Sequence, residues 1–177
     1  MVNRKITQIV LLIAIIVGAF FLYRYLFPSA ERQIIRRLNN LATDASFAVG
    51  SEGQLKPGQI TSGLFAKRVT DYFTRDATLV LEDIDGYSRS LTGSEEIRQS
   101  LFAARSQLDS LIVAILDPQV RVESPGRSGQ VSATARVSWE EAGQKLILSA
   151  RELSIGLVKL DRQWFISRLE TVSVIKR

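Results

Sequence analysis

The side chains that this 177-residue sequence offers for chemistry are carboxylates, tyrosines, lysines and arginines, because it contains no histidine and no cysteine. The missing histidines remove the commonest general base and the commonest zinc ligand. The missing cysteines exclude disulfides, thiol catalysis and thiolate metal sites. We therefore expect no metal and no cofactor, and triad hydrolases and most transition-metal enzymes become improbable.

Large aromatic side chains are the second group of candidate functional residues. They lie on predicted helices and strands, where they could line a ligand pocket, although large aromatics on strands more often belong to the core. The pocket candidates are Phe65, Tyr72, Phe73, Trp139 and Trp164.

The stretch Ile6 to Phe27 determines where the rest of the chain can work. Its 22 residues are almost all apolar, and as a helix they reach roughly 33 Å, against about 30 Å for a bilayer's hydrocarbon core. This predicts one transmembrane helix within an anchor of residues 1–30. A cleaved signal peptide is the alternative, but the apolar run is too long and too aromatic for one. The side chains that suit the membrane-water boundary are Tyr23, Arg24, Tyr25, Arg32, Arg36 and Arg37.

The formal charge of +5 divides unevenly along the chain. Residues 1–30 carry three basic side chains and no acid, whereas residues 31–177 carry 20 basic and 18 acidic side chains, a net +2. Most of the excess flanks the predicted anchor, so we expect no nucleic-acid partner. The short charged N-terminal tail is hard to export, which favours a bacterial inner (plasma) membrane protein with its C-terminal domain outside the cytoplasm.

Residues 31–177 predict a single domain that begins with helices. Apolar residues of Glu31 to Val49 form one stripe at helical spacing, and this helix either packs on its own domain or lies on anionic headgroups. A second helix is predicted from about Thr61 to Thr74, with Leu64, Phe65, Val69, Tyr72 and Phe73 on its buried face. A short strand, Ala77 to Leu81, follows and ends at the acidic sequence EDIDG. Thr92 and Glu95 fit a capping box that opens a third helix.

From Leu111 onward the apolar period is two, which indicates strands. Alternation over Val131 to Trp139 gives one strand with a single buried face. In the next strand the buried parity changes, which predicts a β-bulge near Arg151 and Glu152. A turn at Asp161 and Arg162 leads to the last strand, Gln163 to Val174. The fold class expected is α+β, with three helices on the concave side of a curved, bulged antiparallel sheet.

This order of elements resembles the nuclear transport factor 2-like superfamily, the cone fold shared with ketosteroid isomerase and scytalone dehydratase. The resemblance is carried by DYFTRDATLVLEDIDG, TGSEEIRQSL and KLDRQWFISRL, which begin at Asp71, Thr92 and Lys159. Similarity to ketosteroid isomerase implies a general base at Asp83 and a hydrogen-bond-donating acid at Glu152. That chemistry needs one ionised carboxylate and one kept neutral by an apolar site. The tyrosine that the family carries on its first helix has no counterpart here, since Leu38 stands near that place.

Three functions remain open at this point. The first is a non-catalytic interaction or assembly module tethered to the membrane, with a protein partner or a homodimer. The second is a binding module that holds a hydrophobic small molecule in the cone. The third is an isomerase or dehydratase that uses Asp83 and Glu152. The fold itself does not choose among them, because it hosts enzymes, carriers and scaffolds alike.

Overall fold

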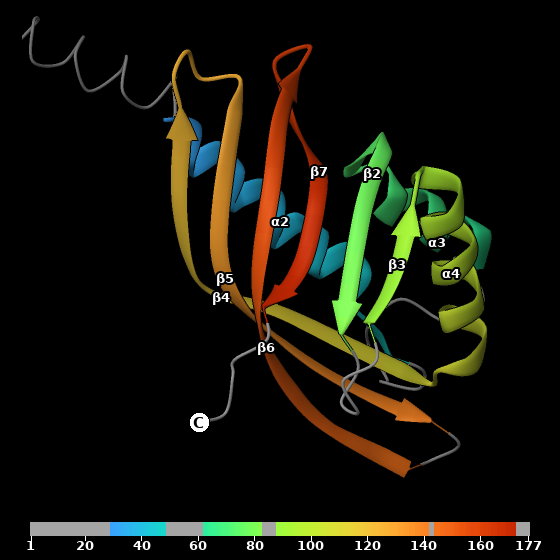
Figure 1. Cartoon of the computed structure of the whole chain (residues 1–177). Coiled ribbons are helices and arrows are strands. Elements are labelled where there is room, and N and C mark those ends of the chain that lie inside the picture. The colour runs from blue at the N-terminus through green and yellow to red at the C-terminus, as the bar shows by residue number, and fades with distance from the viewer. Residues whose placement is uncertain (1–28, 49–61, 83–87, 142–143, 173–177) are drawn as a thin grey trace, which may run out of the picture.

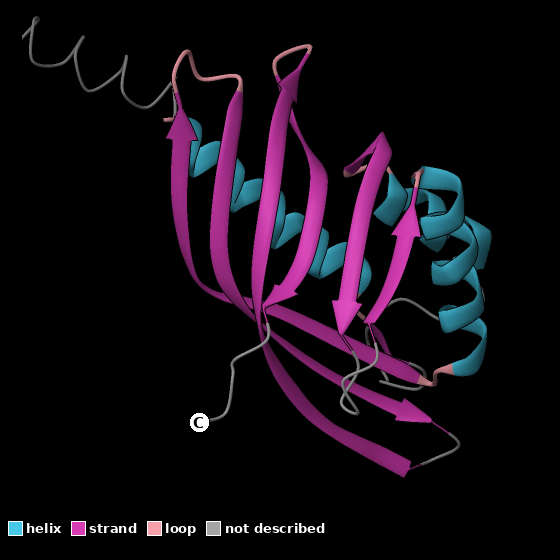
Figure 2. Ribbon diagram, viewed as in Figure 1, coloured by secondary structure: helices cyan, strands magenta, loops and turns pink. Residues whose placement is uncertain are grey.

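One long helix, α2 (Ala30–Ala45), crosses a single face of a bent sheet in this computed structural model (Figure 1). The structure describes residues 29–48, 62–82, 88–141 and 144–172. Two shorter helices, α3 (Ser62–Thr70) and α4 (Ser94–Gln107), pack together beside one end of the sheet (Figure 2). The strands are β1 (Phe47–Ala48), β2 (Phe73–Glu82), β3 (Ser88–Thr92), β4 (Ser110–Glu123), β5 (Ser128–Glu141), β6 (Gln144–Leu160) and β7 (Gln163–Val172).

The first predicted helix is confirmed in its position and its buried stripe, but it ends at Ala45 instead of Val49, because Phe47 and Ala48 form the strand β1. The Ser29 side chain accepts a hydrogen bond from the Arg32 amide at 3.4 Å and caps α2. The predicted apolar stripe is the face that packs inward, and the cationic and amide side chains of the opposite face are exposed. The buried residues of the stripe are Ile34, Leu38, Leu41 and Ala42.

The other two helices begin or end differently from the prediction. α3 stops at Thr70, so that Tyr72 lies in a turn and Phe73 opens β2, and Leu64, which the helical pattern placed inside, is 55% exposed. The capping box at α4 is wrong. Glu96, one residue later than predicted, accepts a hydrogen bond from the Thr92 amide at 2.7 Å.

The seven strands form one sheet in the order β1-β4-β5-β6-β7-β2-β3. All neighbours are antiparallel except β2 and β7, which run parallel, so the predicted purely antiparallel sheet is wrong on this point. The strands β1 and β3 were not predicted. β3 has a single buried residue, Leu91, and therefore shows no alternating pattern in the sequence.

The sheet bends at bulges, one of them misplaced by the prediction. Arg151 and Glu152 pair in continuous register with Ala135 and Thr134, so no bulge lies there. The register of β5 with β6 shifts earlier, between Val137 and Trp139. A second shift, between Leu116 and Gln119 on β4, adds one residue at Asp117, whose φ is 50°. Extra residues of this kind bend a strand and increase its twist.

The core lies between the helices and one face of the sheet, here called the inner face. It joins the stripe of α2 to strand residues of β5, β6 and β7 that are almost fully buried: Val131, Ile155, Leu157 and Ile166. The predicted α+β class and the predicted burial of alternate residues are confirmed.

None of the helices within the described ranges has the length and apolar character to cross a membrane. The predicted span Ile6 to Phe27 and its flanking residues Tyr23, Arg24 and Tyr25 lie outside those ranges.

The two faces of the sheet should respond differently to the same truncation. Ile166 is fully buried on β7, whereas Ile112 on β4 is 55% exposed. We expect Ile166→Ala to lower the free energy of unfolding by about 2–5 kcal/mol, and Ile112→Ala to change it by no more than about 0.5 kcal/mol. Urea denaturation of both variants measures this, and equal losses would contradict the assignment of the two faces.

Candidate functional site

A hydrogen-bonded pair, Tyr72 and Asp44, lies where α2 meets the turn between α3 and β2. The Tyr72 hydroxyl donates to Asp44 Oδ2 at 2.6 Å, and Arg68 Nη1 lies 3.6 Å from the other carboxylate oxygen. Burial, followed by the hydrogen bond to Asp44, raises the pKa of Tyr72 to about 12. The phenol therefore stays protonated to well above neutral pH and donates its hydrogen bond to Asp44 throughout that range.

Arg37 packs over this pair from α2. Its guanidinium carbon lies 4.1 Å from the centre of the Tyr72 ring and 5.5 Å from that of Phe165, and Nη2 donates to the Asp71 carbonyl at 2.9 Å. Such cation-π contacts stabilise a desolvated pair by roughly 1–2 kcal/mol. The side chain of Arg37 thus packs against the domain, whereas those of the neighbouring Arg32 and Arg36 are exposed. The predicted place of these three arginines at the membrane interface stays a prediction.

Four of the five aromatic pocket candidates belong to one buried cluster: Phe65, Tyr72, Phe73 and Trp164. Trp139, on β5, is only half-buried. The cluster's side chains pack with the α2 stripe and the strand residues of the core. The ring of Phe65 also meets that of Phe47 edge-on, with their centres 5.3 Å apart. A role for these residues in lining a pocket stays a prediction.

The two predicted catalytic carboxylates are not brought together by any described contact. Asp83 lies outside the described residues. Glu152 is exposed on β6, and because side chains alternate along a strand it points away from its neighbour Leu153, which is buried on the inner face. This position lacks the apolar surroundings that a neutral carboxyl donor needs. The catalytic pair stays a prediction.

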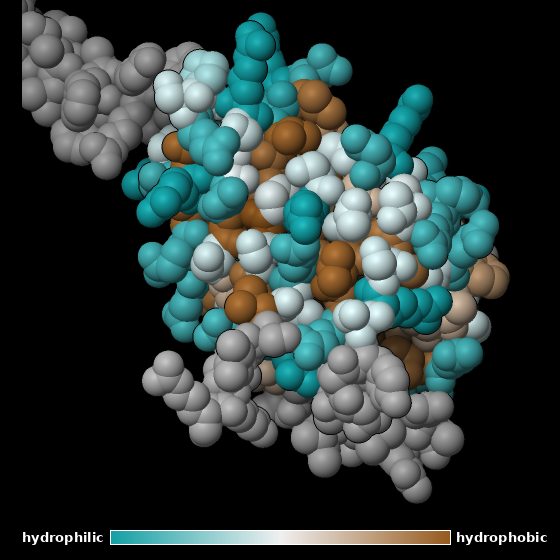
Figure 3. Space-filling view, viewed as in Figure 1, coloured by the Kyte–Doolittle hydropathy of each residue, from teal (hydrophilic) through white to brown (hydrophobic). Residues whose placement is uncertain are grey.

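The opposite side of the sheet, here called the outer face, carries no helix of the described chain (Figure 1). Its central rows run across three strands, with Ser132 beside Ser154 and Glu170 in one row and Thr134 beside Glu152 in the next. On β5, β6 and β7 the outer-face residues include Gln130, Ser132, Thr134, Arg136, Ala150, Glu152, Ser154, Gly156, Arg168, Glu170 and Val172. Two cations balance two acids among them, and Arg168 pairs with Glu170. The space-filling view shows uncharged and apolar surface between the charged side chains (Figure 3).

A groove of about 200 Å³ separates α3 from α4 and is lined by Gly63, Ala66, Arg98, Gln99 and Phe102. It is smaller than typical small-molecule sites, which occupy about 300–1,000 Å³. Arg98, at its edge, already donates two hydrogen bonds to Glu95. The groove therefore offers a shallow, partly apolar surface instead of an enclosed pocket.

No set of three or more acidic, histidine or cysteine side chains that could hold a metal occurs among the described residues. The acidic sequence after Glu82 lies outside them.

Comparison with known proteins shows the fold. No family model and no curated protein sequence matches the chain. A candidate scytalone dehydratase from Novosphingobium aromaticivorans superposes with a TM-score of 0.59 at 11% identity, over 82% of this chain and 84% of that one. A candidate calcium/calmodulin-dependent protein kinase II association domain from Xanthomonas campestris has a TM-score of 0.59 at 14% identity, over 82% and 89%. A protein from Kribbella flavida has a TM-score of 0.61 at 15% identity, over 83% of this chain and 92% of that one.

These identities are low enough that the likeness speaks for the fold alone. The superposition over about four fifths of the chain supports the predicted α+β fold of helices on a curved sheet, and membership of the nuclear transport factor 2-like superfamily stays a prediction. The activities of these neighbours do not transfer on this ground.

Sequence reasoning missed the pairing of Asp44 with Tyr72 and the outer face as a unit. The polar parity of the strand from Val131 to Trp139 was visible as Ser132, Thr134 and Ser138. No pattern in the sequence indicates that Asp44 lies beside Tyr72, because the two are 28 residues apart and meet only through the packing of α2.

Tyr72→Phe should remove one hydrogen bond while keeping the ring beneath Arg37, and should lower the free energy of unfolding by about 1–2 kcal/mol at neutral pH. Folding raises the pKa of Tyr72 from 10.0 to about 12. The contribution of the protonated phenol to the free energy of unfolding is therefore fully present below pH 10 and is lost as the pH rises toward 12. The difference in stability between the two proteins should therefore shrink above pH 10.

Ultraviolet titration of tyrosinate provides the direct measurement, since Tyr72 should ionise after an exposed tyrosine. Asp44→Asn is the matched control, because it keeps the shape but removes the carboxylate, and it should lower the pKa of Tyr72 toward 10. Ionisation of Tyr72 at an ordinary pKa in the unsubstituted protein would refute the buried pair.

Proposed function

We propose that this chain is a single-pass, membrane-tethered assembly module that docks a protein partner, or a second copy of itself, through the outer face. The carrying observation is the composition of that face. Three of the five residues in its central rows carry hydroxyl groups, and the two acids of these rows, Glu152 and Glu170, are offset by Arg136 and Arg168, so that little net charge has to be desolvated when the surface is covered.

Antiparallel sheets commonly have one solvent-exposed face, and so exposure alone does not indicate a binding surface. Solvent-exposed faces usually carry long charged side chains. Here Ser132, Ser154 and Thr134 share the centre with Glu152 and Glu170, so that hydroxyl side chains outnumber charged ones there, and interface cores are likewise depleted of charge. Val172 and Ile112, both exposed apolar residues, extend this surface at its margins.

Two further points support assembly over chemistry. One neighbour of the same fold, from Xanthomonas campestris, is named for an association domain. Within this chain, the aromatic residues that could have surrounded a substrate pack against one another in the core.

The membrane tether rests on the apolar stretch Ile6 to Phe27. α2 begins at Ala30, and therefore only three residue steps separate the predicted span from the domain. Three extended steps reach about 11 Å, which holds the domain close to the bilayer. We place it outside the cytoplasm of a bacterial inner membrane, because the charged N-terminal tail is hard to translocate.

One observation favours a second function, the binding of a hydrophobic small molecule in the cone. Trp164 is 3% exposed, and its indole Nε1 has no hydrogen-bond partner in the described part of the chain. A ligand with an acceptor oxygen would satisfy this donor. Phe65 and Phe73 fill the same core, which ranks this function second.

Site-specific crosslinking tests the outer face, because the chain has no cysteine of its own. Ser154→Cys lies in the centre of the face, and Ser106→Cys, at a position on α4 that is also exposed, is the matched control. In native membranes we expect a photoreactive benzophenone maleimide, attached to the new cysteine and irradiated, to convert the Ser154 variant into a larger crosslinked species and to leave the Ser106 variant monomeric. A monomer from both variants, with the fold intact by circular dichroism, would rule out docking through this face.

Alkaline carbonate extraction tests the tether. The full chain should remain in the membrane pellet, and a chain with Ile13→Arg and Val17→Arg should move into the supernatant because charges at the bilayer centre are costly. A reporter fused after Arg177 should be active only outside the cytoplasm. Release of the unsubstituted chain by carbonate would remove the tether from the proposal, and cytoplasmic reporter activity would reverse the orientation.

A further inference from the structure

Three segments far apart in the sequence meet at one end of the cone. They are the start of α2 (residues 29–36), the β4-β5 turn with the strand end before it (121–127) and the β6-β7 turn with the end of β6 (159–162), and together they are called the tether end (Figure 1). The Lys159 amide donates to the Arg127 carbonyl at 2.7 Å, which joins the two turns. A methyl group placed on Gly129 would lie 3.3 Å from Ile34 Cδ1 and 3.8 Å from the Trp164 ring, so α2 and both hairpins pack closely here.

The tether end is the positive end of the domain. Six cations against three acids give it a net charge of +3, while residues 31–177 as a whole carry only +2, so that the remainder carries −1. The cations are Arg32, Arg36, Arg121, Arg127, Lys159 and Arg162, and the acids are Glu31, Glu123 and Asp161. All of them are exposed except Lys159, which is half-buried.

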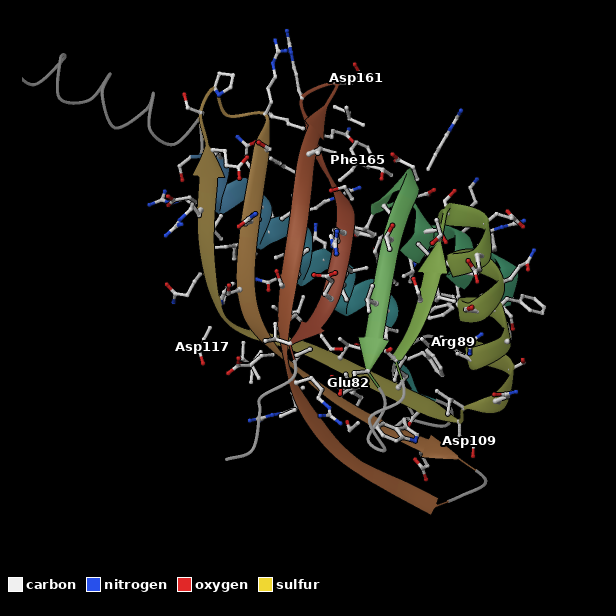
Figure 4. All side chains as sticks on the ribbon, in the orientation of Figure 1. Glu82, Arg89, Asp109, Asp117, Asp161 and Phe165 are labelled. Carbon is white, nitrogen blue, oxygen red and sulfur yellow. The ribbon has the colours of Figure 1, made fainter. Side chains whose placement is uncertain are left out.

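An apolar side chain stands among these charges. Leu160 is 51% exposed at the last position of β6, next to the turn whose tip carries Asp161 (Figure 4). Both turn residues have positive φ, 47° at Asp161 and 68° at Arg162, as a two-residue hairpin turn requires. The tight turn therefore projects Leu160 together with Arg162. Leucine beside arginine and lysine is the combination that suits the boundary between headgroups and acyl chains.

The position of the tether end relative to the bilayer follows from the length of the joint. Phe27 ends the predicted span, and Ala30 begins α2. The three steps between them reach about 11 Å, and the headgroup layer on one side of a bilayer is roughly 5–8 Å thick. The start of α2 is thus held at the headgroups, and the two turns packed beside it are held there as well.

We propose that the tether end is a second membrane contact, in which Arg127 and Arg162 bind anionic lipid headgroups and Leu160 inserts beside them. This inference rests on the proposed tether and adds a site about 100 residues further along the chain. Juxtamembrane cations of this kind are attracted to anionic lipid within a Debye length of the surface. The contact would fix the tilt of the domain, because three separate points then touch the bilayer.

Quenching of a probe at Leu160 tests the contact in the full chain reconstituted into vesicles. Leu160→Cys carries a bimane label, and the vesicles contain headgroup-spin-labelled lipid in phosphatidylcholine, with or without phosphatidylglycerol. Ile112→Cys is the matched control, since Ile112 is 55% exposed near the opposite end of β4. We expect several-fold stronger quenching at residue 160 than at 112 when phosphatidylglycerol is present, and at least half of it to be lost in high salt.

Charge reversal separates electrostatic attraction from simple proximity. Arg127→Glu with Arg162→Glu should remove most of the quenching at residue 160, and Arg75→Glu with Arg89→Glu, at exposed positions on β2 and β3, should leave it unchanged. Equal quenching at residues 160 and 112 overturns the inference, and so does quenching that is the same with and without phosphatidylglycerol. This holds also if a protein partner covers the tether end. Flotation separates the two proposals: a chain that does not float with the vesicles refutes the tether and this contact together, whereas one that floats without quenching refutes the contact alone.

Discussion

The fold depends on burial of one stripe of α2 in the inner face of the sheet. Ile34 and Leu38 are at most 1% exposed, and they pack with strand residues that come from the last third of the chain. Each such side chain contributes roughly 1.5–3 kcal/mol when it leaves water. Without this helix the inner face of β5, β6 and β7 would lie open, and therefore the first described helix and the last strands fold as one unit.

Contacts at several points along its length fix α2. Near its start, the apolar side chain of Ile34 packs close to Gly129. Near its end, Asp44 accepts from the Tyr72 hydroxyl, and between them Arg37 reaches the Asp71 carbonyl. A helix held at several points along its length is a stiff element. Any constraint on its first turn, such as a membrane tether, is therefore passed to the whole domain.

Local patterns were enough to predict the parts of the fold in which neighbouring residues decide the outcome. The stripe of α2, the alternation from Val131 to Trp139 and the turn at Asp161 are read from spacing or residue type alone, and the structure confirms them. The parallel pairing of β2 with β7 joins Phe73 to Ile166 and depends on where distant segments end in space.

The candidate surfaces were harder to predict for the same physical reason. Polar residues at alternate positions of one strand indicate its solvent-exposed face. Only the register between strands, which pairs Ser132 with Ser154, shows that hydroxyl side chains of neighbouring strands lie side by side. Bulges add a further difficulty, because an extra residue reverses the parity. The sequence signal placed that reversal near Arg151, several residues after the observed shift in register.

The tether end and the outer face are compatible because of how the strands run. β6 and β7 are joined by the turn at the tether end, and both strands run from there into the domain (Figure 1). The sheet therefore extends lengthwise away from the tether end. If the tether end rests on the bilayer, the outer face stands roughly upright on the membrane surface. A partner tethered in the same membrane would then meet Ser132 and Ser154 by lateral diffusion, without leaving the bilayer. Confinement to one plane at a fixed orientation also raises the effective concentration of two such faces, so that even a low-charge face of modest intrinsic affinity suffices for assembly.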